Sequence, residues 1–415
     1  MLYREINECR ICGNKNIYKV VELGDMALTG VFPKIDETVE EGPLTLVKCD
    51  DRDGISCGLL QLAHNYLPEK LYGDNYGYRS GLNRSMVAHL QELANQIKNK
   101  VEIKKGDLIL DIGSNDGTLL SCYGIGGVDL VGIDPTIKKF GMYYEKGITK
   151  IPDFFSSEVY KKEFGNRKAK VVTSIAMFYD LEHPIDFMAQ VYDILDDEGV
   201  WVLEQSYMPR MIDNVSYDTI CHEHLEYYAI RQFSWMVSRI GMKIVDIELN
   251  EINGASFKVF LAKKGSKMKG NEKMVRAIIE AEEARNLQDP ETYADFNKSI
   301  FDHKEALIKF IEKVKRDGKT IYGYGASTKG NVILQFANLN KDDLPAIAEV
   351  NEYKYGRLAP GTDIEIKSEA DIKALKPDYL LVLPWHFKDN IIGKEKEYLD
   401  NGGHLVFPLP KIEVV

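Results

Sequence analysis

The sequence predicts an α/β protein with a central domain built on a doubly wound sheet, a smaller α/β domain after it, and a small zinc-binding domain before both. Three observations support this: two cysteine pairs near the amino terminus, alternating strand- and helix-type segments from Asp107 to Lys264, and a second strand–glycine-turn–helix unit after Gly318. The expected parts are an amino-terminal domain (1–68), a central domain with a doubly wound sheet (69–265), a helical connector (266–316) and a smaller carboxyl-terminal α/β domain (317–415).

The composition fits a globular protein that works in the cytoplasm. Hydrophobic residues make up 44% of the 415, charged residues make up 28%, and the formal net charge is −11. An acidic chain is a poor match for nucleic acid. No apolar run is long enough to span a bilayer, and Met1–Cys9 is too polar for a signal peptide. We therefore expect cytoplasmic localisation, no membrane or nucleic-acid partner, and either a monomer or a homo-oligomer.

Four cysteines in two local pairs predict a structural zinc site. Cys9 and Cys12 form a C-x-x-C-G knuckle, and Cys49 and Cys57 form a second, more widely spaced pair. In a reducing compartment, cysteines are thiols or metal ligands rather than disulfides, and four thiolates suit a tetrahedral Zn²⁺ with no open position. Free buried cysteines are the alternative, because the second spacing is unusually long.

The central domain is organised around a strand that ends in an acid and a glycine turn. Its candidate cofactor contacts are Asp111, Gly113, Asn115, Asp116 and Gly117. The glycine spacing excludes the G-x-G-x-x-G dinucleotide fingerprint, and the acids suit an ammonium group or a ribose better than a pyrophosphate. The D-x-G-x-x-x-G pattern resembles motif I of class I S-adenosylmethionine-dependent methyltransferases, which implies their Rossmann-like sheet.

Two later strand ends supply further contacts for this cofactor. Asp134 and Pro135 follow the next strand about 20 residues on, where such folds bind ribose hydroxyls. Asp153 stands beside Phe154 and Phe155, which are expected to hold the adenine ring and its amino group. A generic strand–helix–strand unit with turn glycines is the alternative.

Hydrophobic periodicity predicts the surrounding helices and strands. Helices are expected over Ser85–Lys100, Ile185–Leu195 and Arg231–Ile240. Leu23–Pro33 is expected to be loop and short strand, and Leu59–Leu62 a strand. The central strands are expected over Leu108–Ile112, Leu130–Asp134, Ile148–Ile151, Lys170–Ala176, Gly199–Glu204, Lys243–Leu249 and Ser256–Lys263, the last two joined at Asn253–Gly254.

The densest cluster of proton-transfer groups follows the fifth of these strands. His222, Glu223 and His224 stand side by side, and such residues serve as general acids and bases. On a strand, the two histidines would point the same way and reach one cavity. An H-x-H metal site with Asp218 or Glu226 as third ligand, and a polar surface loop, are the alternatives.

The carboxyl-terminal part follows long helices expected over Ala277–Lys315. Its first strand leads through a glycine turn into Ser327, Thr328 and Lys329. Hydroxyls and a lysine at a helix amino terminus predict a phosphate or diphosphate site. Trp385 and His386 follow a later strand end, where either a ligand or an interface would lie. Further strands are expected over Ala346–Val350, Asp378–Leu383 and His404–Phe407.

Taken together, these motifs resemble the nucleotide-sugar C-methyltransferases, typified by the sugar C-3′-methyltransferases of deoxysugar pathways. The resemblance extends along nearly the whole chain. It rests on the C-x-x-C-G start, Tyr76-x-Tyr78-x-Ser80, the D-I-G-S-N-D-G motif from Asp111, Asp134-Pro135, Asp153-Phe154-Phe155, Glu223-His224, Gly323-Tyr324-Gly325-Ala326-x-x-Lys329, Arg357-Leu358-x-Pro360-Gly361, Pro377-Asp378-Tyr379 and Trp385.

The resemblance implies a zinc-binding domain, an S-adenosylmethionine domain and a carboxyl-terminal domain that helps hold a nucleotide sugar. It implies that a base removes the proton α to the ketone of a nucleotide-linked 4-keto-6-deoxyhexose, and that the enolate takes the methyl group. His224 matches the family's base, and Glu223 would either orient it or tune its charge. The other implied contacts are Tyr76 to the sugar, Tyr78 and Ser80 to the methionine end of the cofactor, Lys329 to the diphosphate, and Ser327, Thr328, Arg357, Trp385 and His386 to the substrate.

Two positions depart from the family pattern. Cys221 stands where a tyrosine is common, three residues before the base, and Asp180, beside Tyr179, replaces a histidine. A thiol is a poor enolate donor, and a carboxylate repels an enolate unless it is protonated or paired. Either His222 or Tyr179 takes over that role, or the acceptor differs. O-methylation of a nucleotide sugar and a non-catalytic scaffold with a cofactor pocket are therefore the alternatives.

Overall fold

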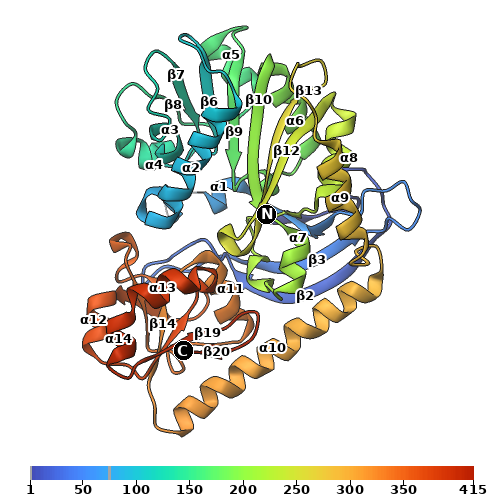
Figure 1. Ribbon diagram of the computed structural model, residues 1–415. Helices are drawn as coiled ribbons and strands as arrows, with labels where there is room; N and C mark the ends of the chain where they lie inside the picture. Colours follow the sequence, from blue (N-terminus) through green and yellow to red (C-terminus); the bar gives the residue numbers. More distant parts are fainter. Residues whose placement is uncertain (1, 73–75) are drawn as a thin grey trace.

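The computed structural model describes residues 2–72 and 76–415. Figure 1 shows the central sheet in the upper half of the view and the carboxyl-terminal domain at the lower left, with strands β2 and β3 between the central sheet and helix α10. Within the described ranges, none of the helices combines the length and apolarity needed to cross a membrane.

The amino-terminal sheet is four-stranded, in the order β11-β4-β3-β2. Its strands are β2 (Ile17–Ala27), β3 (Glu41–Cys49), β4 (Leu60–Leu62) and β11 (Glu226–Tyr227), and a separate pair joins β1 (Tyr3–Glu5) to β5 (His64–Tyr66). The expectation of loop and short strand over Leu23–Pro33 missed most of β2. Two register shifts in the β2–β3 pairing interrupt the alternation by which strands are recognised in a sequence.

The central sheet is seven-stranded, in the order β12-β13-β10-β9-β6-β7-β8, and its first five strands in the sequence are parallel. The strands are β6 (Leu108–Ile112), β7 (Asp129–Ile133), β8 (Thr149–Ile151), β9 (Ala169–Ile175), β10 (Leu195–Ser206), β12 (Met242–Asn250) and β13 (Ser256–Lys263). All seven expected strands are present, and β6 is buried along its whole length. Parallel strands covered on both faces carry continuous apolar runs, which is why they were predicted closely.

Short helices connect these strands. They are α1 (Pro68–Leu71), η1 (Ser80–Leu82), α2 (Arg84–Lys100), α3 (Thr118–Ser121), α4 (Ile137–Phe140), η2 (Gly141–Tyr143), α5 (Ser157–Phe164), η3 (Phe178–Asp180), α6 (Pro184–Ile194), α7 (Met208–Asp213), η4 (Tyr217–Thr219) and α8 (Ile230–Arg239). The β12–β13 hairpin is confirmed, but its connection contains the 3₁₀ turn η5 (Ile252–Gly254) instead of a two-residue turn.

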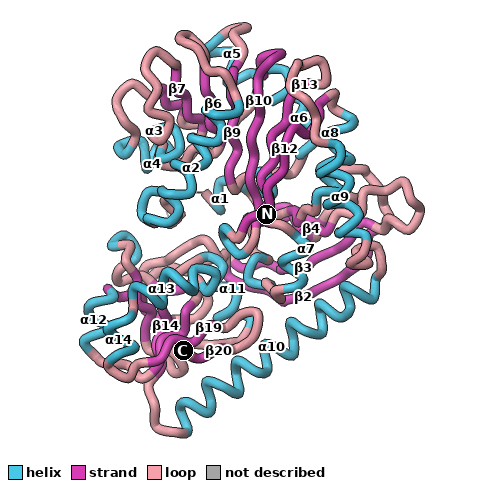
Figure 2. The backbone as a smooth tube through the Cα atoms, in the orientation of Figure 1, coloured by secondary structure: helices cyan, strands magenta, loops and turns pink. Residues whose placement is uncertain are grey.

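A two-helix connector leads to the last domain. α9 (Glu272–Glu283) is followed by α10 (Pro290–Arg316), which Figure 2 shows as one uninterrupted helix beside the amino-terminal sheet. At 27 residues, α10 is about 40 Å long, since an α-helix rises about 1.5 Å per residue. Its buried side chains recur every three or four residues, as one apolar face requires; they are Tyr293, Phe296, Ile300, His303, Leu307, Ile311 and Val314.

The carboxyl-terminal sheet is also seven-stranded, in the order β16-β17-β15-β14-β18-β19-β20. Its strands are β14 (Ile321–Tyr324), β15 (Ala346–Glu349), β16 (Leu358–Ala359), β17 (Ile364–Ser368), β18 (Tyr379–Val382), β19 (His404–Phe407) and β20 (Glu413–Val414). Its helices are α11 (Thr328–Phe336), η6 (Glu352–Lys354), α12 (Glu369–Ala374), η7 (Trp385–Phe387), α13 (Lys388–Lys394) and α14 (Lys396–Asp400). The three strands expected after the glycine turn are present as β15, β18 and β19.

The carboxyl-terminal domain is fastened to the segment that follows β2. Gln335 on α11 donates to the Ala27 carbonyl and accepts from the Ala27 N–H, and Asn331 donates to the Thr29 carbonyl at 2.8 Å. Arg357 donates to the Phe32 carbonyl at 2.8 Å. One hydrophobic core runs through all three parts of the molecule. The end of β2 and the segment after it are thereby held against the carboxyl-terminal domain.

Candidate active site

The four predicted zinc ligands converge in the amino-terminal domain. Sγ of Cys9 lies 3.4 Å from Sγ of Cys57, Sγ of Cys12 lies 3.6 Å from Sγ of Cys49, and all four sulfurs lie within 4.8 Å of one another. A tetrahedral zinc with Zn–S bonds of about 2.3 Å sets sulfurs about 3.8 Å apart. The donor set and its spacing therefore fit Zn²⁺ with no open position.

The turn after β6 has left-handed backbone at both of its glycines. Gly113, Asn115 and Gly117 have φ of 74°, 49° and 77°. A Cβ on Gly113 would lie 2.9 Å from a side-chain carbon of Met177, so both the left-handed backbone and the close approach require glycine there. The turn brings the Asn115 N–H to the Asp134 carboxyl at 2.8 Å. The two predicted cofactor motifs are thus in contact.

Two buried carboxyls face this turn. Burial raises the pKa of Asp111 to about 7, although Thr173 donates to it at 2.6 Å. Burial also raises the pKa of Asp134, whose Oδ1 accepts hydrogen bonds from Thr136. Pro135 lies next to Asp134, at the end of β7. Carboxyls in this position fit an ammonium group and ribose hydroxyls, which are parts of S-adenosylmethionine.

Asn115 and Asp116 hold the loop before α2. The Asn115 side chain accepts from the Ser80 N–H at 3.0 Å and donates to the Tyr78 carbonyl at 3.3 Å. The Gly81 N–H donates to Asp116 at 2.9 Å. These two side chains position Tyr78 and Ser80 beside the turn. Gly73, Asp74 and Asn75, which come shortly before Tyr76 in the sequence, lie outside the described residues.

The predicted adenine contacts lie at the end of β8. Asp153 and Phe154 are exposed there, and Asp153 accepts from the Phe154 N–H. The Phe155 ring packs against Phe187, with ring centres 5.2 Å apart. Phe154 is therefore more accessible to an adenine than Phe155, which belongs to the core.

His222 and His224 contact different parts of the molecule, because residues 221–225 form a turn before β11 instead of the expected strand. His222 is fully buried. Its Nδ1 accepts from the Thr29 N–H at 3.3 Å, and its Nε2 donates to the Gly42 carbonyl at 3.3 Å. Burial lowers the pKa of His222 to about 4. His222 thus joins the turn to the amino-terminal sheet.

His224 is held differently. Its Nδ1 lies 2.9 Å from the Thr219 carbonyl. A carbonyl only accepts, so Nδ1 carries the proton and Nε2 keeps its lone pair. Burial, together with the charge of Lys329, lowers the pKa of His224 to about 3, and its ring contacts Tyr179 with centres 4.3 Å apart. His224 is therefore a neutral imidazole with a fixed tautomer.

Glu223 faces the amino-terminal domain, where Thr29 donates to it at 3.5 Å. A Cβ on Gly30 would overlap the Glu223 carboxyl, so the backbone there requires glycine. Burial raises the pKa of Glu223. The resemblance implied that Glu223 orients His224. In the structure, the ring is oriented by the hydrogen bond that His224 Nδ1 donates to the Thr219 carbonyl.

A buried tyrosine–acid pair lies beside these groups. Tyr72 donates to Asp180 Oδ2 at 2.7 Å. The Tyr72 and Tyr76 rings meet at 5.4 Å between centres. Burial raises the pKa of Asp180 well above its usual range, and the nearby Glu223 carboxyl adds to this. Tyr179 and Asp180 lie in η3, which follows β9 in the chain.

The carboxyl-terminal domain brings Lys329 into the same region. Its Nζ donates to the Asn253 carbonyl at 2.9 Å, and its charge affects the pKa values of Asp218, Cys221, His224 and His386. Ser327 caps α11 by accepting from the Gly330 N–H at 3.0 Å, and Thr328 begins that helix. The predicted diphosphate site and the predicted base are therefore neighbours.

Three predicted substrate residues lie at domain contacts. Trp385 Nε1 donates to the buried Asp218 at 2.8 Å, and His386 packs against the Trp385 ring. Arg357 donates to Phe32, at the junction with the amino-terminal domain. Asp218 thus links η4 to η7, a contact that sequence spacing does not reveal.

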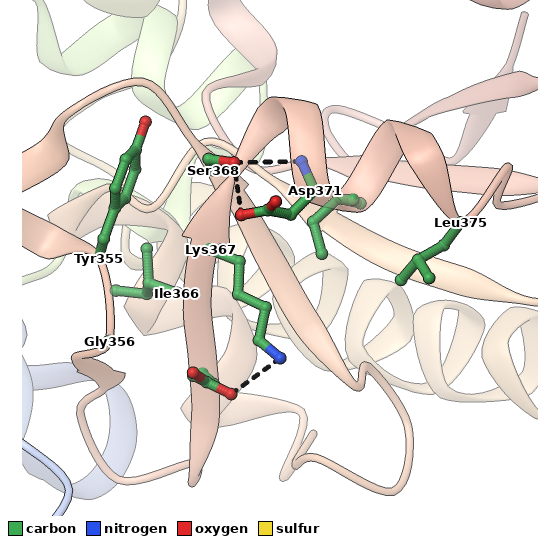
Figure 3. Close-up of a pocket in the computed structure, with 9 residues that line it drawn as sticks. Tyr355, Gly356, Ile366, Lys367, Ser368, Asp371 and Leu375 are labelled. Atoms are coloured by element: carbon green, nitrogen blue, oxygen red, sulfur yellow. Dashed lines mark hydrogen bonds and ion pairs between the residues drawn. The ribbon is translucent and has the colours of Figure 1, made fainter.

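A separate surface groove lies on the carboxyl-terminal domain (Figure 3). It has a volume of about 450 Å³ and is lined by residues of β17 and α12, including Lys367 and Asp371. None of the predicted site residues lines it. It is therefore distinct from the region around His224.

Three family models match successive parts of the chain. The model described as "Putative zinc binding domain" matches residues 9–72, "Methyltransferase domain" matches 78–247, and "C-methyltransferase C-terminal domain" matches 251–410. The C-methyltransferase NovU of Streptomyces niveus is 28% identical over 416 residues, which cover 100% of this chain and 98% of the relative.

Solved structures match over less than half of the chain. The plantazolicin methyltransferase BpumL, in complex with a pentazolic desmethylPZN analog and SAH, is 15% identical with a TM-score of 0.34, covering 43% of this chain and 83% of that one. LepI in complex with SAM is 12% identical with a TM-score of 0.33, covering 44% of this chain and 53% of that one. These distant structures carry no argument about function. The class of protein follows from the successive domain matches, the full-length relative and the four-cysteine cluster. The chain is thus an S-adenosylmethionine-dependent methyltransferase that joins a zinc-binding amino-terminal domain to the carboxyl-terminal domain of C-methyltransferases.

Proposed function

We propose that the protein methylates a carbon α to the ketone of a nucleotide-linked sugar, with His224 as the base. The observation that carries this proposal is the neutral His224 imidazole, whose Nδ1–H is fixed on the Thr219 carbonyl and whose Nε2 is left to accept a proton. Removing a proton from carbon requires such a positioned base. The resemblance to nucleotide-sugar C-methyltransferases supports the ketosugar as acceptor.

S-adenosylmethionine supplies an electrophilic methyl group when it is bound. Asp111 and Asp134 fit its ammonium group and its ribose, and the loop from Tyr78 to Ser80, held by Asn115, lies next to them. His224 Nε2 takes the α-proton of the sugar, and the resulting enolate carbon accepts the methyl group. Tyr76, whose ring contacts Tyr72, is assigned to the sugar side of this site from the resemblance.

The nucleotide end of the substrate is assigned to the carboxyl-terminal domain. Lys329 stands in the first turn of α11, whose N-terminal N–H groups and dipole favour an anion. Among the described residues, Asp218 Oδ1 and His386 Nδ1 are buried without a hydrogen-bond partner. Buried polar atoms are normally paired, so polar groups of a substrate would satisfy them. A diphosphate on Lys329 would leave the sugar beside His224.

The test is incubation with S-adenosylmethionine and a panel of nucleotide-linked 4-keto-6-deoxysugars, followed by mass spectrometry of the product. We expect the mass of one methylene unit to be added and, from a substrate deuterated at the α-carbon, one deuterium to be lost. Addition without loss of deuterium would indicate O-methylation. Binding of S-adenosylmethionine without turnover of any ketosugar would contradict both reactions.

Replacing Lys329 with methionine tests the diphosphate assignment. We expect the KM for the nucleotide sugar to rise about 10- to 100-fold, because a hydrogen bond to a charged group contributes about 1.5–3 kcal/mol. The affinity for S-adenosylmethionine should not change. Lys367→Met, in the separate groove, is the matched control and should leave both constants unaltered. An unchanged KM in Lys329→Met would contradict the proposal that the diphosphate binds at this site.

A further inference from the structure

The hydrogen-bonded pair Tyr72 and Asp180 has no assigned role in the reaction. Tyr72 stands at the end of α1 and Asp180 at the end of η3, so the pair joins two distant segments of the chain. Tyr72 donates to Asp180 Oδ2 at 2.7 Å. The other oxygen, Oδ1, is buried and has no hydrogen-bond partner among the described residues. A buried oxygen of this kind calls for an additional partner.

The position of the pair relates it to His224. Tyr179, the neighbour of Asp180, contacts the His224 ring, and its carbonyl accepts from the Leu225 N–H at 2.9 Å. Tyr76, the residue expected to face the sugar, contacts the Tyr72 ring. The unpartnered oxygen of Asp180 therefore lies in the part of the molecule where the sugar is expected.

The other candidates for a donor to the enolate are less suitable. His222 has both ring nitrogens engaged by Thr29 and Gly42. Cys221 is fully buried, and a thiol is only a weak hydrogen-bond donor. His222 therefore cannot turn a donor towards the sugar without breaking an existing buried contact, and Cys221 would supply only a weak donor.

We propose that Asp180, held by Tyr72, donates a hydrogen bond from Oδ1 to the carbonyl oxygen of the sugar and stabilises the enolate. This inference rests on the proposed C-methylation, since only an enolate needs such a donor. The assignment makes Asp180 a catalytic residue and Tyr72 a positioning residue that acts through it.

The α C–H bond breaks, its proton goes to His224 Nε2, and its electron pair forms the enolate, whose oxygen accepts from Asp180. The enolate carbon then bonds to the methyl group, the S–CH₃ bond breaks, and its electron pair stays on sulfur, giving S-adenosylhomocysteine. The ketone re-forms, and His224 returns the proton to solvent. Asp180 keeps its proton throughout.

The surroundings of Asp180 favour its protonated form. Burial raises its pKa well above the usual range, the Glu223 and Glu226 carboxyls raise it further, and the hydrogen bond from Tyr72 partly opposes this. The other titratable groups near the pair are Tyr76, Tyr179, Cys221 and Tyr227. A neutral carboxyl can donate to an enolate, whereas a carboxylate would repel it.

The test compares Asp180→Asn, Asp180→Ala and Tyr72→Phe in two assays on the full chain. One assay is exchange of the α-hydrogen of the ketosugar for deuterium in D₂O with S-adenosylhomocysteine bound, which reports enolate formation alone. The other is the pH profile of methyl transfer. Thermal unfolding and S-adenosylmethionine titration identify variants that fail to fold.

Loss of the donor in Asp180→Ala should slow exchange about 100- to 1,000-fold, the usual effect of removing one oxyanion donor. Asp180→Asn keeps an N–H donor, so it should retain more activity than Asp180→Ala. Its pH profile of methyl transfer should lack the alkaline limb that titration of Asp180 produces. Tyr72→Phe removes the bond that lowers the pKa of Asp180, so this limb should move to higher pH while the plateau falls.

Three results would overturn the role of Asp180. They are equal loss in Asp180→Asn and Asp180→Ala, exchange in folded Asp180→Ala at the wild-type rate, and an alkaline limb that Tyr72→Phe does not move. If the wild-type protein itself neither exchanges the α-hydrogen nor methylates carbon, then the proposed function fails, which is a different outcome from these.

Discussion

Replacing His224 with asparagine should lower kcat about 100- to 10,000-fold, the range expected when a general base is lost. Asparagine can still donate to the Thr219 carbonyl that His224 now engages at 2.9 Å, so the turn should keep its conformation. The affinity for S-adenosylmethionine, measured by calorimetry, should be unchanged, while α-hydrogen exchange should disappear.

His222→Asn is the matched control, because the two histidines are neighbours with different contacts. His222 bonds to Thr29 and Gly42, so its replacement should lower the free energy of unfolding but leave kcat per folded molecule nearly unchanged. If kcat falls equally in both variants, or if His224→Asn also abolishes cofactor binding, the assignment of His224 as the base is wrong.

The pH profile gives an independent check on the base. The neutral form of His224 is the active one, so kcat/KM should fall on the acid side only as pH approaches about 3. The charge of Lys329 lowers this pKa, and Lys329→Met should therefore move the acid limb to higher pH. An acid limb near 6.5 in both proteins would show that an ordinary, solvated group controls the rate.

The second large effect is expected from loss of the metal. Cys57→Ala should reduce the zinc content from about one per chain to near zero, since structural zinc requires all four ligands. Binding of structural zinc contributes on the order of 10 kcal/mol to folding in zinc-finger peptides. The amino-terminal sheet should therefore unfold at a much lower temperature in the variant, as circular dichroism and metal analysis would show.

This unfolding should also abolish methyl transfer, although the cysteines lie outside the active site. The segment after β2 carries Thr29 and Gly30, which contact His222 and Glu223 directly. Cys122→Ala is the control, because Cys122 does not belong to the cluster. A Cys57→Ala protein that retains both zinc and activity would contradict the four-cysteine site.

The sequence predicted the central sheet well because parallel strands and glycine turns are determined locally. β6 is apolar along its length, and Gly113 and Gly117 occupy left-handed backbone. The same local logic identified the two cysteine pairs, which the fold then brings within 4.8 Å of one another. By contrast, β2 was missed, because two shifts in its pairing interrupt the alternation.

By itself, the sequence predicted the α/β class, the cluster of four cysteines and the glycine turn after β6, since each depends on residue type and short spacing, whereas His224 was proposed as the base from the resemblance to a known family. Only the tertiary structure decided which groups meet. In the structure, His222 and His224 make different contacts because their segment is a turn. The partner of His224 is the Thr219 carbonyl and not Glu223, and Tyr72 donates to Asp180. The structure also places Lys329 near His224. Some of these contacts join residues far apart in the chain, and the packing of the three domains sets the distances between them. The others depend on the local path of the backbone, which spacing in the sequence does not reveal.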